Sequence, residues 1–269
     1  TVVPELADMH MPVEGVFHNI TLASIRKQYP GQAPKIMSAL WGAGQMMFNK
    51  IMVVADANVA LTDYASLARV ISLNTDPIAD VHFSRGPVDL LDHSSNRYAY
   101  GSKIGIDATS KLPEEIDLPL KQAGEMATSR TEGPIDGITS IRRDLLAQNI
   151  SLIIISVKKD EQRQVRKIAA ELISQELTSG AKFVLFIDDL LDAGSLPQVA
   201  WIAANNIDPL RDCFYIEHEP GTKIPVLFID ATRKSRNLDN FQRDWPNVTV
   251  MDDATIGKVD KDWTKLGLG

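Results

Sequence analysis

Two stretches of this 269-residue chain repeat one another without a gap. Residues 20–83 align with residues 152–215 at a constant offset of 132. Identical pairs along this alignment include Ser24/Ser156, Lys27/Lys159, Ile36/Ile168, Leu40/Leu172, Lys50/Lys182, Asp56/Asp188, Ala68/Ala200, Asn74/Asn206, Asp76/Asp208, Pro77/Pro209 and Asp80/Asp212. After a change in length, the sequence of residues 106–109 (Ile-Asp-Ala-Thr) returns at residues 229–232. Because chance rarely preserves so many identities without a gap, the repeat predicts two copies of one α/β unit.

The composition is typical of soluble globular proteins. Hydrophobic residues make up 44% of the chain and charged residues 23%, and the length suffices for two domains of ordinary size. A net charge of -7 argues against the basic face that a nucleic-acid-binding protein needs. No apolar run reaches the ~18 residues of a membrane span, and the first residues lack the basic start of a signal peptide.

Cys213 is the single cysteine in the sequence. The chain therefore cannot form an internal disulfide, which agrees with a reducing compartment, and we expect a cytoplasmic protein. Cys213 aligns with Val81 on a predicted strand, so a packed thiol is expected. The chain begins at Thr1 and not at a methionine, and we interpret it as a fragment of a longer protein.

Apolar runs and turn residues predict strands that alternate with helices in both copies. In copy one, strands are expected at residues 20–26, 51–55, 81–84 and 104–108, and helices from the turn at Pro34 to about residue 48 and from a cap at Asp63 to about residue 73. In copy two, strands are expected at residues 152–157, 183–187, 213–216 and 226–229, and helices at residues 161–178 and 195–204. Such alternation favours a mainly parallel sheet with right-handed crossovers.

The predicted fold class is therefore α/β, with two tandem similar domains, each a mainly parallel sheet flanked by helices. Copy one is expected to occupy residues 1–118. The polar segment 119–134, which contains glycines and shows no clear period, is the expected linker. Copy two is expected to occupy residues 135–269 and to end in a helix.

A few polar residues are candidates for binding a metal ion or another ligand. Asp89, Asp92 and His93 lie in one loop and resemble ligands of a hard metal ion, although hydrogen bonding within the loop is the favoured explanation. Asp56 and Asp188 end buried strands at the sheet edge where open α/β folds bind ligands. Because both copies keep this aspartate, capping of the next turn explains it more simply. No metal site is predicted for this chain.

Copy one carries a series of more specific motifs between Pro12 and Glu115. They are His18-Asn19 with the strand that follows, the turn Tyr29-Pro30-Gly31-Gln32-Ala33, the step Asp76-Pro77…Asp80, the loop Pro87-Val88-Asp89…Leu91-Asp92-His93, and Gly101-Ser102-Lys103-Ile104-Gly105-Ile106-Asp107-Ala108-Thr109. In order and spacing these motifs resemble the carboxyl-terminal part of the UbiD family, the 3-polyprenyl-4-hydroxybenzoate decarboxylases and their menaquinone-pathway relatives. Residues 243–246 and 259–268 are similar to the terminal segment of that family, so a diverged second copy is inserted before it here.

The resemblance implies that the full-length protein is a carboxy-lyase. It implies non-oxidative decarboxylation of an aromatic or unsaturated carboxylic acid, with quinone biosynthesis as the expected pathway. The implied cofactors are prenylated flavin mononucleotide (FMN), a divalent metal (manganese or magnesium) and potassium, and the implied catalytic set is Arg–Glu–Glu. In the family these groups belong to a preceding domain that no part of residues 1–269 resembles. We therefore expect this chain to contain no catalytic residue, to bind no cofactor alone, to be inactive alone, and to need a missing N-terminal flavin-binding domain as its partner.

The resemblance also implies that this part of the enzyme lends a wall to the active-site cleft. The expected wall is the segment after the strand predicted at 104–108, with Lys111, Leu112 and Pro113, together with Lys103 on the preceding loop. A lysine there would help an anionic substrate or a phosphate group through its charge, whereas a solvated lysine is the simpler explanation.

Contacts between subunits are the other implied role, so a homo-oligomer is expected. The family joins subunits through this domain, and its terminal helix takes part. In this chain the terminal helix has an apolar stripe at three- and four-residue steps, formed by Ile256, Val259, Trp263 and Leu266. Core packing within copy two would produce the same stripe.

Copy two departs from the family pattern, because Lys159-Asp160-Glu161-Gln162 replaces the turn around Tyr29. Copy two has lost the rigid turn but keeps the apolar pattern of the core, which indicates that this unit is retained for its fold. Our hypothesis is that copy two packs on copy one about a pseudo-twofold axis and replaces a contact that other members make between subunits. Two other classes of function remain open: a non-catalytic assembly module built from a duplicated α/β domain, and a nucleotide-binding doubly wound protein.

Overall fold

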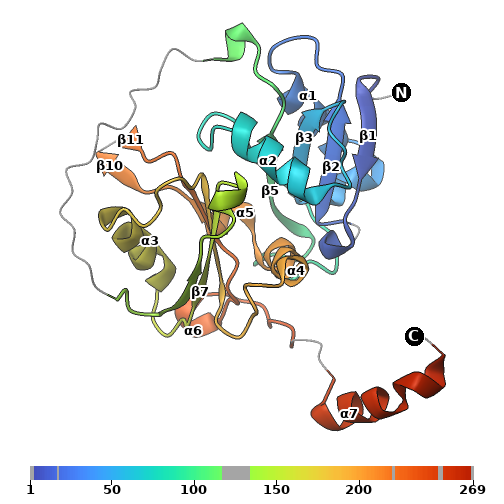
Figure 1. The fold of residues 1–269 in the computed structure, drawn as a ribbon. Helices are drawn as coiled ribbons and strands as arrows, with labels where there is room; N and C mark the ends of the chain where they lie inside the picture. The colour runs from blue at the N-terminus through green and yellow to red at the C-terminus, as the bar shows by residue number, and fades with distance from the viewer. Residues whose placement is uncertain (1–2, 17, 117–133, 220–221, 248–250, 268–269) are drawn as a thin grey trace.

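The computed structural model describes residues 3–16, 18–116, 134–219, 222–247 and 251–267. It contains two similar α/β units that lie side by side (Figure 1), each built on a five-stranded sheet. The strand order is β1-β2-β3-β5-β4 in copy one and β6-β7-β8-β12-β9 in copy two. The two orders are equivalent, which confirms the duplicated α/β fold that the repeat predicts.

Copy one consists of five strands and two helices with three short 3₁₀ turns among its described residues. The strands are β1 (Leu6–His10), β2 (Ile20–Ile25), β3 (Ile51–Asp56), β4 (Val81–Pro87) and β5 (Tyr100–Asp107). The helices are α1 (Gln32–Trp41) and α2 (Tyr64–Asn74), and the 3₁₀ turns are η1 (Val13–Gly15), η2 (Gly44–Phe48) and η3 (Pro113–Glu115).

Copy two repeats this arrangement and adds a small hairpin and a C-terminal extension. Its sheet contains β6 (Ile138–Arg142), β7 (Leu152–Val157), β8 (Phe183–Asp188), β9 (Cys213–Phe214) and β12 (Leu227–Asp230). Its helices are α3 (Gln164–Ser174), α4 (Leu196–Asn206) and α5 (Pro209–Asp212), with the 3₁₀ turn η4 (Leu146–Gln148) and the hairpin β10 (Glu217–Glu219) and β11 (Thr222–Lys223). The extension contains α6 (Arg236–Asp239), α7 (Asp253–Asp262) and η5 (Trp263–Leu266).

The three central strands of each sheet are parallel, whereas both edge strands are antiparallel to their neighbours. A crossover helix lets neighbouring strands run parallel, as α1 does between β2 and β3. β4 instead turns back into β5 through a loop without a helix, so these two strands pair antiparallel. The parallel prediction thus holds for the three central strands of each sheet and not for the edge strands.

Local sequence signals explain most helix ends. Asp63 caps α2 as predicted, because its side chain accepts a hydrogen bond from the Ser66 N–H at 3.1 Å. α1 ends at Trp41 and does not continue to residue 48 as expected, since the φ of Gly44 is 52°, outside the range of an α-helix. The antiparallel edge strands β1 and β6 were not predicted from the sequence.

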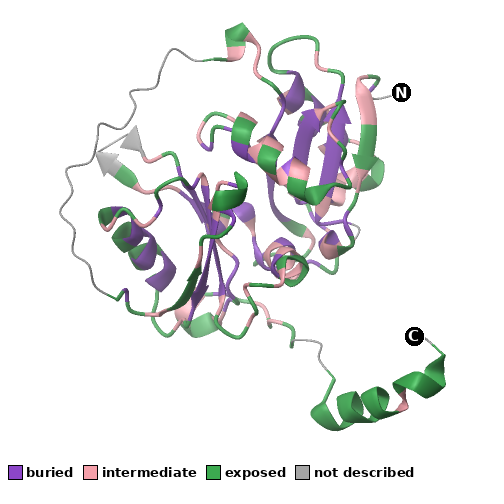
Figure 2. Ribbon diagram, in the orientation of Figure 1, coloured by how far each residue is buried: buried purple, intermediate pink, exposed green. Residues whose placement is uncertain are grey.

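Both sheets are buried on both faces (Figure 2). In copy one, Ile25 packs with Ile36 of α1 on one face, and Val53 packs with Leu67 of α2 on the other face. In copy two, α3 covers one face of the sheet and α4 the other. The burial of apolar side chains on both faces accounts for the continuous apolar runs of the central strands.

A further apolar cluster joins the two copies. It contains Val81 and Ile104 of copy one and Phe183, Cys213 and Leu227 of copy two. Cys213 is therefore the packed thiol that the sequence predicts, and burial raises the pKa of this thiol well above its ordinary value. The two units share this part of their cores.

Three sequence predictions concern the connections and the chain ends. The expected linker, residues 119–134, lies outside the described residues except for Pro134, so its boundaries stay a prediction. α7 and η5 lie apart from both sheets (Figure 1). None of the helices that the structure describes combines the length and the apolar character that crossing a bilayer requires.

Candidate functional site

A lysine just beyond the end of β2 organises the carboxyl edge of the first sheet. Lys27 Nζ donates a hydrogen bond to Thr109 Oγ1 at 2.8 Å and forms an ion pair with the Glu115 carboxylate. Glu115 also accepts hydrogen bonds from the N–H groups of Gly31 (2.8 Å) and Leu112 (2.9 Å). One ion pair thereby connects the strand end, the turn before α1 and the segment after β5.

Copy two contains the same arrangement. Lys159 Nζ donates a hydrogen bond to Thr232 Oγ1 at 3.0 Å and forms an ion pair with Asp239 at 2.8 Å. Asp239 accepts a hydrogen bond from the Ser235 N–H at 2.8 Å, so it occupies the role that a glutamate has in copy one. The identity of Lys27 and Lys159 therefore reflects a structural role shared by the copies.

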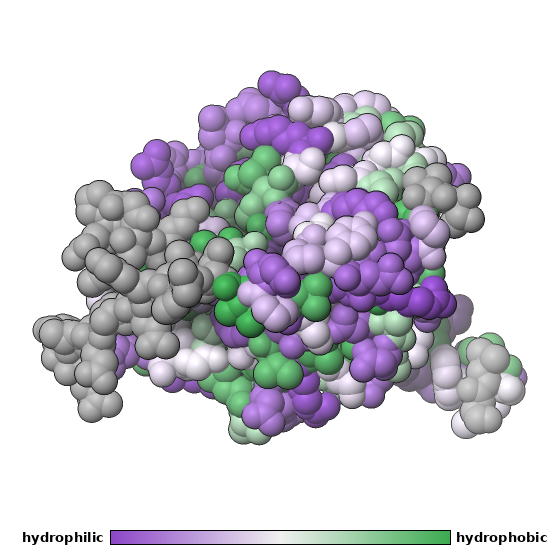
Figure 3. All heavy atoms as spheres, turned by 90° about the horizontal axis from the view of Figure 1, so that it is seen from above, coloured by the Kyte–Doolittle hydropathy of each residue, from purple (hydrophilic) through white to green (hydrophobic). Residues whose placement is uncertain are grey.

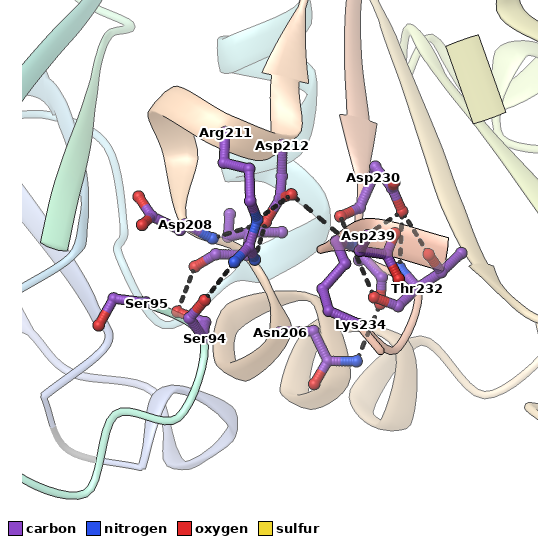
Figure 4. Close-up of polar contacts among 12 residues, drawn as sticks. Ser94, Ser95, Asn206, Asp208, Arg211, Asp212, Asp230, Thr232, Lys234 and Asp239 are labelled. Carbon is purple, nitrogen blue, oxygen red and sulfur yellow. Dashed lines mark hydrogen bonds and ion pairs between the residues drawn. The ribbon is translucent and has the colours of Figure 1, made fainter. Parts of the chain in front are cut away.

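A second ion network lies beside it in copy two (Figure 4). Lys234 Nζ lies 3.0 Å from the Asp230 carboxylate and 3.6 Å from the Asp212 carboxylate. Asp230 also accepts a hydrogen bond from the Thr232 N–H at 3.0 Å. Burial opposes the ionisation of Asp230, but the charges of Lys234 and Lys159 and these hydrogen bonds lower its pKa. The network joins the end of β12 to the start of the edge strand β9.

Three of the four residues predicted to form the cleft wall lie together after β5. Lys111 Nζ lies 3.0 Å from the Asp80 carboxylate and 3.2 Å from the Asp107 carboxylate, the same arrangement as in copy two. Leu112 is half-buried and Pro113 is exposed. The Lys111 charge is therefore neutralised within copy one.

Lys103 lies at the opposite end of the same sheet, and the structure does not bring it to the other three residues. Its Nζ donates hydrogen bonds to the carbonyl oxygens of Met47 (2.6 Å), Asn49 (2.6 Å) and Pro87 (2.7 Å). The residue is 2% exposed, and burial lowers its pKa to about 8. The Lys103 ammonium thus holds η2 and the end of β4 together.

The two copies contact one another through equivalent lysines. Lys50 Nζ of copy one donates a hydrogen bond to the Asn205 carbonyl, and Lys182 Nζ of copy two donates to the Leu73 carbonyl, both at 3.5 Å. Lys50 aligns with Lys182 in the repeat, and Leu73 aligns with Asn205. The two contacts are therefore exchanged when the copies are exchanged, which is the pattern of a twofold interface.

Copy one adds a buried ion pair to this interface. Lys50 Nζ lies 2.6 Å from Asp92 Oδ2, and both side chains are 1% exposed. Asp92 Oδ1 accepts hydrogen bonds from the N–H groups of Ser94 and Ser95. Arg211 of copy two donates to the Ser94 carbonyl at 2.6 Å (Figure 4). Burial opposes the ionisation of Asp92, but the Lys50 ammonium and these hydrogen bonds lower its pKa.

Hydrogen bonding is the role of the loop residues that resembled metal ligands. Asp89 accepts a hydrogen bond from the Leu91 N–H at 2.8 Å, and Asp92 is paired with a lysine. His93 Nε2 lies 3.3 Å from Asn206 Oδ1 of copy two, and burial lowers the pKa of its imidazole. Within the described ranges, no group of three or more His, Cys, Asp or Glu side chains is placed to hold a metal ion.

The aspartates at the ends of β3 and β8 hold the loop that follows the last parallel strand, not the next turn as expected. Asp56 Oδ2 accepts hydrogen bonds from both the N–H and the hydroxyl of Ser110, at 2.8 and 2.7 Å. Asp188 Oδ2 accepts one from the N–H of Arg233 at 2.8 Å. Burial raises the pKa of Asp188.

A cavity of about 470 Å³ lies at the carboxyl edge of the second sheet. Its lining includes Asp188 at the end of β8, Trp201 of α4, Arg233 after β12, Trp245 of the extension and His93 of copy one. The His93 and Trp245 rings meet edge to face with their centroids 4.7 Å apart. The cavity was not predicted from the sequence, because its residues lie far apart in the chain and form no local motif.

The apolar stripe of the terminal helix is exposed. Its members keep between 41% and 51% of their surface accessible: Ile256, Val259, Trp263 and Leu266. Core packing within copy two, one of the two explanations of this stripe, is therefore wrong. On the face of the molecule shown in Figure 3, by contrast, hydrophilic side chains cover most of the surface and hydrophobic ones form smaller groups.

Solved UbiD-class enzymes are similar to a part of this chain. HmfF from Pelotomaculum thermopropionicum, solved in complex with FMN, is 24% identical over 47% of this chain and 27% of that chain, with a TM-score of 0.38. Vanillic acid decarboxylase from Sedimentibacter hydroxybenzoicus in its open form is 25% identical over 44% of this chain and 28% of that chain, also with a TM-score of 0.38.

Two relatives align with this chain over different lengths. An uncharacterised protein of Helicobacter pylori strain J99 is 32% identical over 248 residues, which are 91% of this chain and 38% of that protein. A protein of Archaeoglobus fulgidus is 43% identical over 113 residues, which are 42% of this chain and 24% of that protein. This chain therefore spans less than two fifths of the Helicobacter protein, while the Archaeoglobus protein aligns over about the length of one copy.

A family model described as the C-terminal domain of 3-octaprenyl-4-hydroxybenzoate carboxy-lyase matches residues 1–108 and 130–235. The first range falls in copy one, and the second falls almost entirely in copy two, so the matched ranges follow the two sheets. Together they cover most of the 269 residues. The chain belongs to the UbiD family and carries the C-terminal domain of these carboxy-lyases.

Proposed function

We propose that this chain is the C-terminal part of a cytoplasmic, non-oxidative decarboxylase that acts on an aromatic or unsaturated carboxylic acid in quinone biosynthesis. The family match across both copies is the observation that carries this proposal. The Helicobacter relative, of which the chain spans 38%, has room for a flavin-binding domain outside the matched region. In the proposed enzyme that domain supplies the catalytic Arg–Glu–Glu set, and this chain alone is inactive.

The proposed cofactors are prenylated FMN, a divalent metal (manganese or magnesium) and potassium. Two structures of HmfF were solved with FMN and with prenylated FMN, respectively, which supports a flavin in a relative of this kind. When bound, such a flavin supplies the electron sink for the decarboxylation, while the protein supplies position and electrostatics. The ligands of the flavin and of the metal are assigned to the flavin-binding domain.

The segment Lys111-Leu112-Pro113 remains our candidate for a wall of the active-site cleft. Pro113 is exposed, and Leu112 is held through its N–H by Glu115, so the segment presents a fixed surface. Because Asp80 and Asp107 neutralise Lys111, the proposed wall acts through shape more than through charge. Lys103, at the opposite end of the same sheet, contributes to the proposed wall only by supporting β5, the strand that precedes this segment.

Copy two is proposed to act as a built-in twofold partner of copy one. In support, Asn19 Nδ2 donates to Asn205 Oδ1 at 2.9 Å, and the aligned residue of copy two, Ser151, donates through its N–H to Ser72 Oγ at 2.8 Å. Each copy thus uses the residue before its first parallel strand to reach a helix of the other copy. Contacts between full-length subunits are proposed to involve the exposed stripe of α7 and η5.

Two measurements on the full-length protein purified from its native source test this proposal. We expect an intact mass well above the 29.7 kDa of this chain, together with flavin absorbance that the isolated chain lacks. A native protein of 269 residues without flavin absorbance would contradict a decarboxylase and would instead support the non-catalytic assembly module.

A further inference from the structure

The duplication supplies an internal comparison between the two carboxyl edges. The ion networks of both copies recur, so the positions that differ are the ones available for another role. Trp201, which lines the cavity of copy two, aligns with Arg69 of copy one. Arg233, also in the lining, follows the second Ile-Asp-Ala-Thr stretch at the place where Ser110 follows the first.

The cavity forms where unduplicated segments meet copy two. His93 belongs to the loop between β4 and β5, for which copy two has no counterpart. Trp245 belongs to the C-terminal extension, and its ring packs edge to face on His93. The volume of about 470 Å³ lies within the range of roughly 300–1,000 Å³ for small-molecule sites. Its place at the carboxyl edge of parallel strands is where open α/β sheets bind ligands.

The polar groups of the cavity have unused bonding capacity. In copy one, Ser110 donates both its N–H and its hydroxyl to Asp56. In copy two, Asp188 accepts the backbone N–H of Arg233, and no second hydrogen bond to its carboxyl arises from the described residues. Neither the Arg233 guanidinium nor the Lys158 ammonium has a carboxylate within ion-pair distance in the part of the chain that the structure describes.

We propose that this cavity of copy two binds a single-ring aromatic carboxylate that carries a hydroxyl group. Trp201 and Trp245 supply aromatic walls for the ring. Arg233 and Lys158 complement the carboxylate, for which the guanidinium offers paired donors. Asp188 accepts the hydrogen bond of the hydroxyl group. This inference goes beyond the proposed decarboxylase activity and does not depend on it, because every group it uses belongs to this chain.

Isothermal titration calorimetry of the 269-residue chain with 4-hydroxybenzoate tests the inference. We expect saturable one-to-one binding with a Kd of roughly 0.1–1 mM, as suits a ligand of this size. Phenol, which lacks the carboxylate, and cyclohexanecarboxylate, which lacks the aromatic ring, should each bind about tenfold more weakly or not at all. Absence of saturable binding of 4-hydroxybenzoate, or equal binding of all three compounds, would overturn the proposal.

Substitutions locate the binding. Arg233→Gln keeps the backbone N–H that holds Asp188, and it should weaken binding of 4-hydroxybenzoate about tenfold, as should Trp201→Leu. Arg26→Gln is the matched control, because Arg26 is exposed and takes the place of Lys158 in copy one, and it should leave the Kd unchanged. If Trp201→Leu does not fold, the test rests on Arg233→Gln alone, because Arg233 is exposed and its replacement should not disturb folding. Unchanged affinity in Arg233→Gln would sink the proposal.

Discussion

At the scale of single residues, the identities between the copies are explained by contacts that hold loops in place. Asn74 donates a side-chain hydrogen bond to the Ala108 carbonyl at 3.0 Å, and the aligned Asn206 donates to the Ala231 carbonyl at 2.9 Å. Both bonds tie the end of a helix to the residue after the last parallel strand. Identity between the copies therefore indicates structure here, and differences between them point to function.

The buried pair between Lys50 and Asp92 gives a first prediction at this scale. Asp92→Asn should destabilise the fold by about 3–5 kcal/mol, because the Lys50 ammonium would stay buried without its counter-charge. Chemical denaturation measures the difference. Asp144→Asn is the control, since Asp144 forms an exposed pair with Arg142, a type worth about 0–1 kcal/mol. Equal losses in the two variants would refute the role given to the buried pair.

Asp188 gives a second prediction, which concerns pH. Burial raises its folded-state pKa above the unfolded value, so the folded protein holds the proton more tightly. The stability that this contributes is complete below the unfolded pKa and is lost as the pH rises through the folded pKa. Asp188→Asn should therefore gain stability relative to the parent chain between acid and neutral pH. A difference in unfolding free energy that stays constant over this range would show the prediction to be wrong.

At the scale of elements, the sequence predicts what is periodic and locally signalled. The central strands and the helices follow from apolar runs and caps, because these elements are buried on the faces that their patterns indicate. β1 and β6 are edge strands with few buried side chains, and they form by pairing with a neighbour, which no local pattern reveals.

The candidate site could be predicted only in part. The sequence locates Lys111, Leu112 and Pro113 after a strand, but it does not reveal that Asp80 and Asp107 neutralise the lysine. Likewise, Lys27 and Glu115 lie 88 residues apart, and their ion pair exists only in the folded chain. The surroundings of Lys103 could not be predicted either, because the three carbonyl groups that accept its hydrogen bonds belong to other segments of the chain.

The terminal helix gives a third prediction. Val259→Asp should change the unfolding free energy of the two sheets by less than about 0.5 kcal/mol, since Val259 is 41% exposed on α7. In the full-length protein the same change should reduce self-association, measured by sedimentation velocity. Leu172→Asp is the comparison, because Leu172 of α3 is 1% exposed in the core and its replacement should unfold copy two. A large loss of stability in Val259→Asp would place α7 in the core after all.

At the scale of the whole molecule, the chain resembles a dimer fused into one polypeptide. The reciprocal contacts of Lys50 and Lys182 are those of a symmetric interface, and fusion turns association into an intramolecular step. The hydrogen bonds of Lys50 and Ser94 with copy two, together with the shared apolar cluster, then fix one relative placement of the two sheets.

Cutting the chain gives a fourth prediction. After cleavage at an engineered protease site within residues 119–134, the two copies should remain associated, because the contacts described above between the sheets are made by residues outside that segment. Gel filtration before and after cleavage should show one species of unchanged size. Separation of the fragments under native conditions would contradict a fused twofold pair.

Release of carbon dioxide by the full-length protein tests the assignment to a decarboxylase most directly. Full-length protein supplied with prenylated FMN, manganese and potassium should release carbon dioxide from at least one acid in a panel of aromatic and unsaturated carboxylic acids. The 269-residue chain should release none under the same conditions. Release by the chain alone, or no release by the cofactor-loaded full-length protein from any acid of the panel, would contradict the assignment.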